Sequence, residues 1–262
     1  MSFSIAIPTH PLFAPLVANA ERICAERGIR LLRGTERDCA EHLARHTVEA
    51  TFISPMSYAL IGLKTDLRII PAPTLVLEGL TYSASVYLKP NAEEIRTCVS
   101  RTANDFIVQM GAIMLSEKFD IPLALRQESF ADITEALRTA DVVIEYGYDA
   151  AQEVVLDVSD EWTDFVEVPM PLGLWVCRPE EVPEDVVEIV YAFRDEAFPD
   201  MQEVFEQEQH GTNAGRTGSI SLAWNDAIEE AVEGTMELLY YTQYVSGIAA
   251  VKIWQRDVVE RV

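Results

Sequence analysis

The sequence has few basic residues: 20 lysines and arginines stand against 43 aspartates and glutamates, a formal net charge of −23 over 262 residues. Lysine is scarce, with only Lys64, Lys89, Lys118 and Lys252. Such an acidic surface repels phosphate backbones and anionic lipid, which disfavours nucleic-acid binding and docking on membranes. The acidic excess is either a solvated shell that maintains solubility or a sign of a salt-rich cytoplasm, where salt screens the repulsion.

Long apolar runs and paired cysteines are also missing. No segment is long and apolar enough to span a membrane. Residues 1–10 have neither a basic region nor a cleavage-like site, so we expect a cytoplasmic protein. No two cysteines form a C-x-x-C pair, which removes zinc-site and thioredoxin-like interpretations and predicts buried thiols in a reducing compartment. The cysteines are Cys24, Cys39, Cys98 and Cys177.

Several familiar catalytic patterns are absent as well. The sequence has no G-x-S-x-G elbow, no dinucleotide-binding fingerprint and no G-K-[ST] phosphate loop. His42 and His46 are spaced like metal ligands, but the H-E-x-x-H order is missing and an exposed helix face explains them better. We therefore expect no metal site.

Strand and helix signals alternate through a chain that is 49% hydrophobic, enough for one or two cores. This alternation predicts parallel sheets with helices on their faces, in a two-lobed α/β fold of the type II periplasmic-binding-protein kind. We expect residues 1–86 and 170–262 in one lobe, 87–169 in the other, two crossovers and a ligand cleft between the lobes. Helices are expected over 12–27, 36–45 and 104–119, and through most of the chain after residue 183.

Polar residues follow the first and third predicted strands. Thr9 and His10 lie in the turn that follows Pro8, where an anion would meet free backbone N–H groups. Ser54 stands at the corresponding place before the helix that Pro55 opens. Each of these side chains could contact a ligand, or could simply cap the helix that follows.

Two small hydroxyl residues, Ser83 and Ser85, lie where the chain is expected to cross between lobes. Together with Gly79 they would let backbone and ligand approach closely. The alternative is ordinary alternation along a strand.

A second group of candidates lies between a predicted strand and a long helix. Hydroxyls, an amide, an arginine and a helix N-terminus converge there, which favours a carboxylate-binding turn over a helix cap. The group consists of Ser100, Arg101, Thr102, Ala103 and Asn104. Glu145 and Tyr146 close another apolar strand, where Glu145 either faces the ligand or pairs with an arginine.

In order and spacing these stretches resemble the chorismate dehydratase family of menaquinone biosynthesis through futalosine, and its sister enzyme that cleaves cyclic dehypoxanthine futalosine. Asp157, Glu161, Trp162, Pro169 and Trp175 are similar to the family's D-L-x-x-E-W…P…W segment. Gly79 to Ser83 resembles its G-x-x-x-S strand, and Ser100 to Thr102 its S-x-[ST] turn. Residues 50–58, 140–147 and 220–249 are similar to further family segments, so the resemblance spans nearly the whole chain.

The resemblance implies an enzyme that removes water from chorismate to give 3-(1-carboxyvinyloxy)benzoate, without a metal or organic cofactor. Ser83 would be a catalytic or orienting hydroxyl, and Ser100 and Thr102 would bind a carboxylate of a small anionic substrate. Two positions depart from the family pattern: Pro8 stands where the family has Asn, and Tyr148 where it has Asp. Thr9 or His10 would then replace the missing amide.

The alternatives are a non-catalytic cytoplasmic binding protein for a small carboxylate or other anion, and an enzyme of the same fold with another substrate. A homodimer is kept as a candidate assembly.

Overall fold

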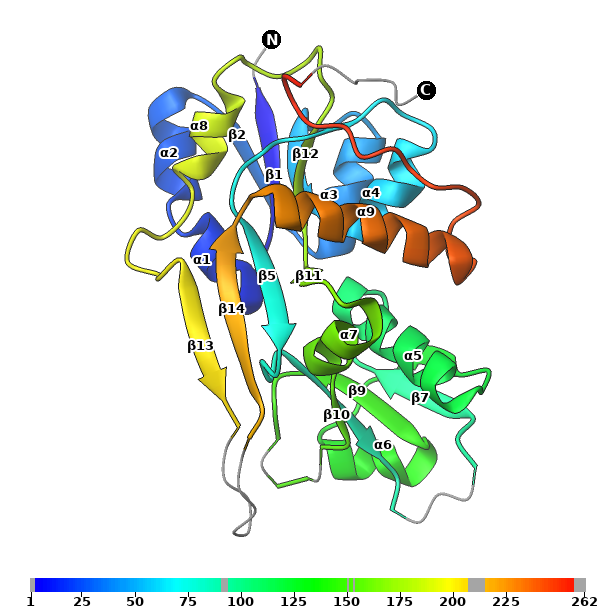
Figure 1. Ribbon diagram of the computed structural model, residues 1–262. Helices are drawn as coiled ribbons and strands as arrows, with labels where there is room; N and C mark the ends of the chain where they lie inside the picture. Colours follow the sequence, from blue (N-terminus) through cyan, green and yellow to red (C-terminus); the bar gives the residue numbers. More distant parts are fainter. Residues whose placement is uncertain (1–2, 91–93, 150, 153, 207–214, 257–262) are drawn as a thin grey trace. The chain divides into compact units, whose positions relative to one another are not determined.

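The computed structural model describes residues 3–90, 94–149, 151–152, 154–206 and 215–256. The chain divides into two compact units (Figure 1). Unit 1 comprises Met1–Val76, Pro171–Asp200 and Ser221–Val262, and unit 2 comprises Leu77–Met170 and Met201–Ile220. In this division the chain leaves unit 1 after Val76, returns to it after Met170, and contributes Met201–Ile220 to unit 2.

Unit 1 is built on a five-stranded sheet in the order β2-β1-β3-β12-β4. Its strands are β1 (Ser4–Pro8), β2 (Arg30–Gly34), β3 (Ala50–Ile53), β4 (Arg68–Ile69) and β12 (Leu174–Cys177). β2, β1 and β3 are parallel, as the strand–helix alternation predicts. β12 enters antiparallel between β3 and β4 because the chain reaches it from unit 2, so the sheet is mixed rather than purely parallel.

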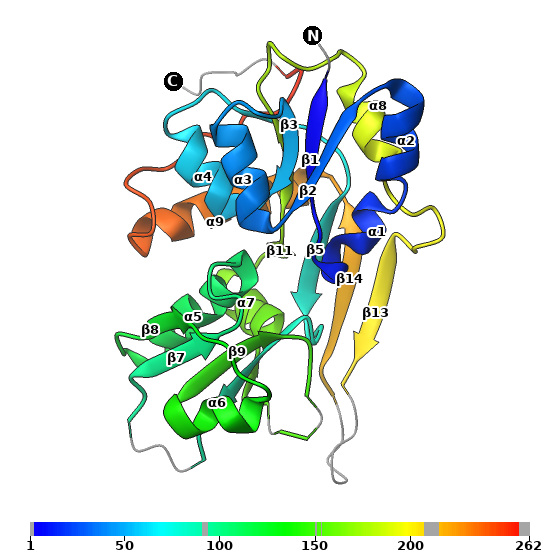
Figure 2. The same ribbon diagram turned by 180° about the vertical axis from the view of Figure 1, so that it is seen from behind.

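Helices pack on both faces of this sheet (Figure 2). They are η1 (Pro11–Phe13), α1 (Ala14–Val17), α2 (Ala20–Arg27), α3 (Glu36–Ala44), α4 (Pro55–Gly62), α8 (Val186–Tyr191) and α9 (Asp226–Tyr241). The helix expected over residues 12–27 is in fact three short pieces: the backbone departs from helical geometry at Phe13 and again at Asn19.

Local sequence signals explain where several of these helices start and stop. Thr35 and Asp38 form a capping box at the start of α3, in which each side chain accepts from the other residue's backbone N–H. α2 ends at Gly28, whose φ of 68° lies in the left-handed region that glycine adopts without strain. The core between the helices and the sheet holds edge-to-face contacts of Phe52 with Phe13 and with Trp175.

Unit 2 has its own five-stranded sheet, in the order β10-β6-β9-β7-β8. Its strands are β6 (Ala84–Leu88), β7 (Thr97–Ser100), β8 (Ala124–Gln127), β9 (Val142–Tyr146) and β10 (Leu156–Asp157), and its helices are α5 (Phe106–Phe119), α6 (Ile133–Thr139) and α7 (Val158–Val166). β7 runs parallel to β8 and β9, whereas β6 is antiparallel to β9 and β10. One buried cluster, which includes Tyr87, Val99 and Leu137, joins this sheet to α6.

Four further strands form a sheet in the order β11-β5-β14-β13. They are β5 (Thr74–Gly79), β11 (Met170–Pro171), β13 (Met201–Phe205) and β14 (Thr217–Ala223). In three of them, β5, β11 and β14, the chain passes from one unit to the other. The expectation of a mostly helical chain after residue 183 was wrong here, because β14 alternates small polar and aliphatic residues and pairs at long range.

Candidate functional site

The carboxyl ends of the neighbouring parallel strands β7 and β9 bring Ser100 and Glu145 together in unit 2. Glu145 Oε1 accepts from Ser100 Oγ at 3.2 Å and from the backbone N–H of Arg101 at 2.6 Å. Arg101 Nε donates to Glu145 Oε2 at 2.9 Å, and its guanidinium lies 4.9 Å from the centre of the Phe130 ring. Glu145 therefore pairs with an arginine, the second of the two roles expected for it.

The Arg101 side chain keeps binding capacity despite this ion pair. It is 48% exposed, whereas the Glu145 side chain is only 8% exposed. A guanidinium carries five N–H donors, and one of them meets Glu145. Arg101 can thus hold Glu145 and still offer a face to an anion in solvent.

The turn between β7 and α5 contains a buried hydroxyl that lacks a well-formed hydrogen bond. The backbone N–H of Thr102 donates to Ser100 Oγ at 3.1 Å, but Thr102 Oγ1 has no hydrogen bond of good geometry with any described residue. Burial raises the pKa of the neighbouring Asp105, an effect that the nearby Tyr146 and Thr102 hydroxyls oppose. The Thr102 hydroxyl is thus buried beside Asp105 without a hydrogen bond of good geometry, an arrangement that is costly in a folded protein and marks Thr102 as a candidate ligand contact.

Two other residues of this turn have protein partners. Asn104 Nδ2 donates to Gln127 Oε1 at 3.0 Å, and the Ala103 carbonyl accepts from Gln109 Nε2 at 3.2 Å. α5 begins at Phe106 rather than at Asn104, because the backbone N–H of Asp105 closes a turn onto the Thr102 carbonyl.

Ser83 ends a chain of buried hydroxyls that starts at the Asp157 carboxylate. Ser159 Oγ donates to Asp157 Oδ1 at 2.7 Å and lies 2.7 Å from Thr81 Oγ1, which lies 2.9 Å from Ser83 Oγ. Exposure rises only from 2% at Asp157 and 0% at Ser159 to 5% at Thr81 and 7% at Ser83. Solvent therefore has little access to any of the four groups.

Backbone geometry and hydrogen bonds hold this chain of hydroxyls in place. Tyr82, between Thr81 and Ser83, has a φ of 56°, and its N–H donates to Asp157 Oδ2 at 2.8 Å. Asp157 also caps α7, since Oδ1 accepts from the N–H groups of Ser159 and Asp160. Burial raises the pKa of Asp157 against the lowering effect of these hydrogen bonds.

Antiparallel pairing of β6 and β9 places Ser85 directly opposite Glu145 and Ala84 opposite Tyr146. The hydroxyl of Ser85 donates to the Gly147 carbonyl at 2.7 Å, and the Gly147 N–H donates to the Ser83 carbonyl at 2.9 Å. The Tyr148 ring lies 4.8 Å from the Tyr82 ring, centre to centre. Most candidates of unit 2 thus gather at one end of its sheet.

Thr9, His10 and Ser54 belong to unit 1, at the carboxyl ends of the adjacent parallel strands β1 and β3. The Thr9 hydroxyl donates to the Gly34 carbonyl at 3.1 Å, and His10 Nδ1 accepts from the Leu12 N–H at 3.2 Å. Ser54 Oγ accepts from the Ser57 N–H at 3.2 Å and so caps α4. The capping role expected as the alternative is therefore present for His10 and Ser54. Burial lowers the pKa of His10.

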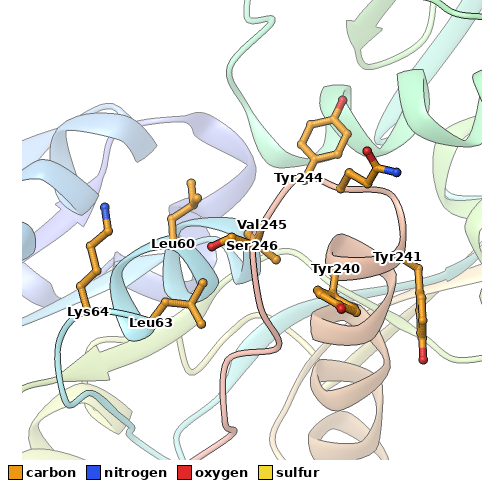
Figure 3. A pocket seen from close by; sticks show the side chains of 9 residues that line it. Leu60, Leu63, Lys64, Tyr240, Tyr241, Tyr244, Val245 and Ser246 are labelled. Atoms are coloured by element: carbon orange, nitrogen blue, oxygen red, sulfur yellow. The ribbon is translucent and has the colours of Figure 1, made fainter.

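A separate pocket lies on unit 1 between the end of α9 and α4 (Figure 3). Leu60, Leu63 and Lys64 lie on one side of it and Tyr240 and Tyr241 on the other, and Gln243, Tyr244, Val245 and Ser246 complete its lining. None of the residues predicted for the ligand site lines this pocket. It is a mixed aromatic and aliphatic hollow in which Lys64 is the cationic side chain.

Sequence reasoning missed three of the groups that surround Ser83. Asp157 contributed only to the family resemblance, and Thr81 and Ser159 were not candidates. The signal for Asp157 was local, an Asp directly before a helix, but it predicts only a cap.

In the described part of the chain, no three His, Cys, Asp or Glu side chains are grouped as a metal site would need. No helix there has the length and apolar character to cross a membrane.

Solved structures share this architecture. An ABC transporter protein from Parabacteroides distasonis superposes with a TM-score of 0.58 at 8% identity, over 98% of this chain and 99% of that chain. Protein AF1704 from Archaeoglobus fulgidus gives a TM-score of 0.53 at 19% identity, over 71% of each chain. The fold is thus α/β, of the type II periplasmic-binding-protein kind, with two lobes.

No curated protein matches the chain in sequence. The family model for menaquinone biosynthesis does match, over residues 3–229, which include every candidate residue of both units. The chain belongs to the menaquinone biosynthesis family.

Proposed function

We propose that the protein is a carbon–oxygen lyase that dehydrates chorismate to 3-(1-carboxyvinyloxy)benzoate, or catalyses a closely related step of menaquinone biosynthesis through futalosine. The observation that carries the proposal is the group of polar residues at one end of the unit 2 sheet. There, the buried hydroxyl of Ser83 and the Ser100–Thr102 turn occupy the positions that match the dehydratase pattern. No cofactor is needed in this proposal.

The reaction breaks one ring C–H bond and one C–OH bond, and the new double bond completes an aromatic ring. It needs a base for the proton and a donor for the leaving hydroxyl. Ser83 can donate a hydrogen bond to that hydroxyl from a site with little water, where such a bond is stronger than in solvent. A carboxylate of the substrate itself can take the ring proton once the substrate is held in place, and this proton then passes to the departing hydroxide, which leaves as water.

The substrate carboxylate would bind at the turn after β7. We assign direct contacts to the Thr102 hydroxyl, which has no good partner, and to the half-exposed Arg101 guanidinium. Ser100 is fully buried and already donates to Glu145, so its part in the proposal is to hold the turn. Ser85, Ala103, Asn104 and Tyr146 would shape the site around these contacts.

Thr9, His10 and Ser54 are the polar candidates of unit 1. Pro8, the last residue of β1, is buried opposite Gly34 and offers neither an amide side chain nor a backbone N–H. Any polar contact from this turn therefore has to come from Thr9 or His10. We place the reaction in the cytoplasm, because Cys24, Cys39, Cys98 and Cys177 are buried free thiols.

The test is to incubate the purified protein with chorismate and to analyse the mixture by mass spectrometry for the loss of one water. Ser246→Ala serves as the matched control, because Ser246 is exposed and lines the separate pocket of Figure 3. Dehydration by both proteins supports the proposal. Unchanged chorismate, with folding confirmed by circular dichroism, would contradict it.

The departures at Pro8 and Tyr148 favour two alternatives: an enzyme of this fold with a different substrate, and a binding protein for a small carboxylate. Tyr148 packs on Tyr82, directly beside Ser83, where the family pattern has an aspartate. Chorismate that binds tightly but is recovered unchanged would identify the binding protein.

A further inference from the structure

The Ser83 hydroxyl is linked through two other buried hydroxyls to the carboxylate of Asp157. Three consecutive oxygen–oxygen distances of 2.7, 2.7 and 2.9 Å link Asp157 Oδ1, Ser159, Thr81 and Ser83. Each hydroxyl has one proton to donate and two lone pairs to accept with. The orientation of one hydroxyl therefore fixes the orientation of the next.

The protons of this chain of hydroxyls have two self-consistent arrangements. With Asp157 ionised, Ser159 donates to the carboxylate and Thr81 donates to Ser159, so the Ser83 hydroxyl has to turn and donate to Thr81. Ser83 then offers only lone pairs to a ligand. With Asp157 protonated the order reverses: the carboxyl donates to Ser159, Ser159 donates to Thr81, and Thr81 donates to Ser83, which is the direction that the structure has for this last hydrogen bond and which leaves the Ser83 proton for the ligand.

Two backbone groups border the chain of hydroxyls. The Gly79 carbonyl lies 2.8 Å from Ser159 Oγ and competes for its proton in both arrangements. Thr81 Oγ1 accepts from the Ser83 N–H at 3.3 Å in either case. With Asp157 protonated, the Ser83 proton has no acceptor within the chain of hydroxyls and is the one that a ligand would accept.

We propose that Asp157 is a positioning residue that sets the direction of the Ser83 hydroxyl proton through the two hydroxyls between them. This inference rests on the proposed function, in which Ser83 donates to the leaving hydroxyl. The protonated state of Asp157 is then the productive one. No proton has to be transferred along the chain; the hydroxyls only rotate.

Burial is the main influence on the protonation state of Asp157. The pKa of Asp157 is raised by burial, which keeps the carboxyl protonated to higher pH than an exposed aspartate. Three carboxylates of the elements around it are paired with basic side chains, Asp160 with Arg216 at 3.0 Å, Glu161 with Lys118 at 2.6 Å and Glu145 with Arg101 at 2.9 Å, and α7 also carries Asp164, which acts electrostatically on Asp160.

The first test needs no substrate. Serine labelled with ¹³C at Cβ is incorporated, the Ser83 resonance is assigned from its loss in Ser83→Ala, and the pH is varied. In the wild type the Ser83 resonance should follow the titration of Asp157, which Asp157→Asn identifies. In Thr81→Val, which is nearly isosteric but has no hydroxyl, this dependence should disappear, and Thr81→Ser should restore it.

Ser159→Ala breaks the chain at another link and should give the same loss, so the test does not depend on one variant folding. A Ser83 resonance that ignores the titration in the wild type, or follows it unchanged in Thr81→Val, would overturn the inference.

The second test uses turnover. If the wild type dehydrates chorismate, Thr81→Val should lower kcat by about 10- to 100-fold with little change in KM, and Thr81→Ser should recover most of it. The wild-type kcat should fall as pH rises through the pKa of Asp157, and Thr81→Val should lose this dependence. If the wild type leaves chorismate unchanged while the resonance coupling is present, the proposed function fails and the positioning role stands.

Discussion

Replacing Gly218 by alanine should destabilise unit 2 strongly, because this glycine lets β14 lie against the turn that leads to Thr81. A Cβ built at Gly218 would lie 2.5 Å from Leu80 N and 2.6 Å from the Glu78 carbonyl oxygen, and it would also meet the Leu80 carbonyl oxygen. All three atoms belong to the backbone, so no side chain can rotate away. The clash has to be relieved by separating the two segments.

The magnitude follows from two contributions. Overpacking of this kind costs about 1–3 kcal/mol. Separation of the segments also weakens the bond from the Leu80 N–H to the Thr217 carbonyl, now 3.2 Å, at a cost of about 1 kcal/mol. We therefore expect a loss of about 3 kcal/mol in the free energy of unfolding, which corresponds to a Tm lowered by roughly 6–12 °C.

Gly234→Ala is the matched control. Gly234 lies inside α9, and a Cβ there would meet nothing within 4 Å. This change should stabilise the protein by about 0.5–1 kcal/mol, since alanine is the better helix former. Thermal unfolding followed by circular dichroism measures both variants. Equal Tm values for Gly218→Ala and the wild type would refute the reasoning.

Three further predictions concern thiols, charge and salt. Burial raises the pKa of Cys39, Cys98 and Cys177 to about 12, so iodoacetamide at pH 8 should label them only after denaturation; fast labelling of the folded protein would contradict this. Glu145→Gln should cost about 1–2 kcal/mol in urea unfolding, because an amide cannot accept from Arg101 with both atoms; a stability equal to the wild type would oppose this. Because of the net charge of −23, Tm should rise between low and molar salt, and an unchanged Tm would remove the salt-adaptation hypothesis.

Local signals predicted the helix boundaries best. The caps of α3 and α4 at Thr35 and Ser54, and the stop of α2 at Gly28, are each decided within about one turn of helix. The strands missed after residue 183 depend on partners far along the chain. β13 is short and mostly exposed, so its sequence has no clear apolar face, and only pairing with β14 makes it a strand.

In the candidate site too, local features could be predicted from the sequence, whereas contacts between distant residues could not. Ser100 and Glu145 could be expected to meet because both lie at the carboxyl ends of strands that were predicted to be parallel. The link from Ser83 to Asp157 could not, since Thr81 and Ser159 are 78 positions apart and hydroxyls have no pattern that signals such a contact. The local sequence indicated which polar residues lie near a strand end, whereas tertiary packing decided which of them form hydrogen bonds with each other.

The most direct test of the central claim, that the Ser83 hydroxyl carries the chemistry, is the kcat of Ser83→Ala for chorismate beside that of Ser246→Ala. Both changes remove one serine hydroxyl, one at the buried end of the hydrogen-bonded chain and one on the exposed rim of the separate pocket. We expect a fall in kcat of about 10²-fold or more for Ser83→Ala and wild-type turnover for Ser246→Ala. Equal turnover in the two variants would contradict it and would exclude Ser83 from the reaction.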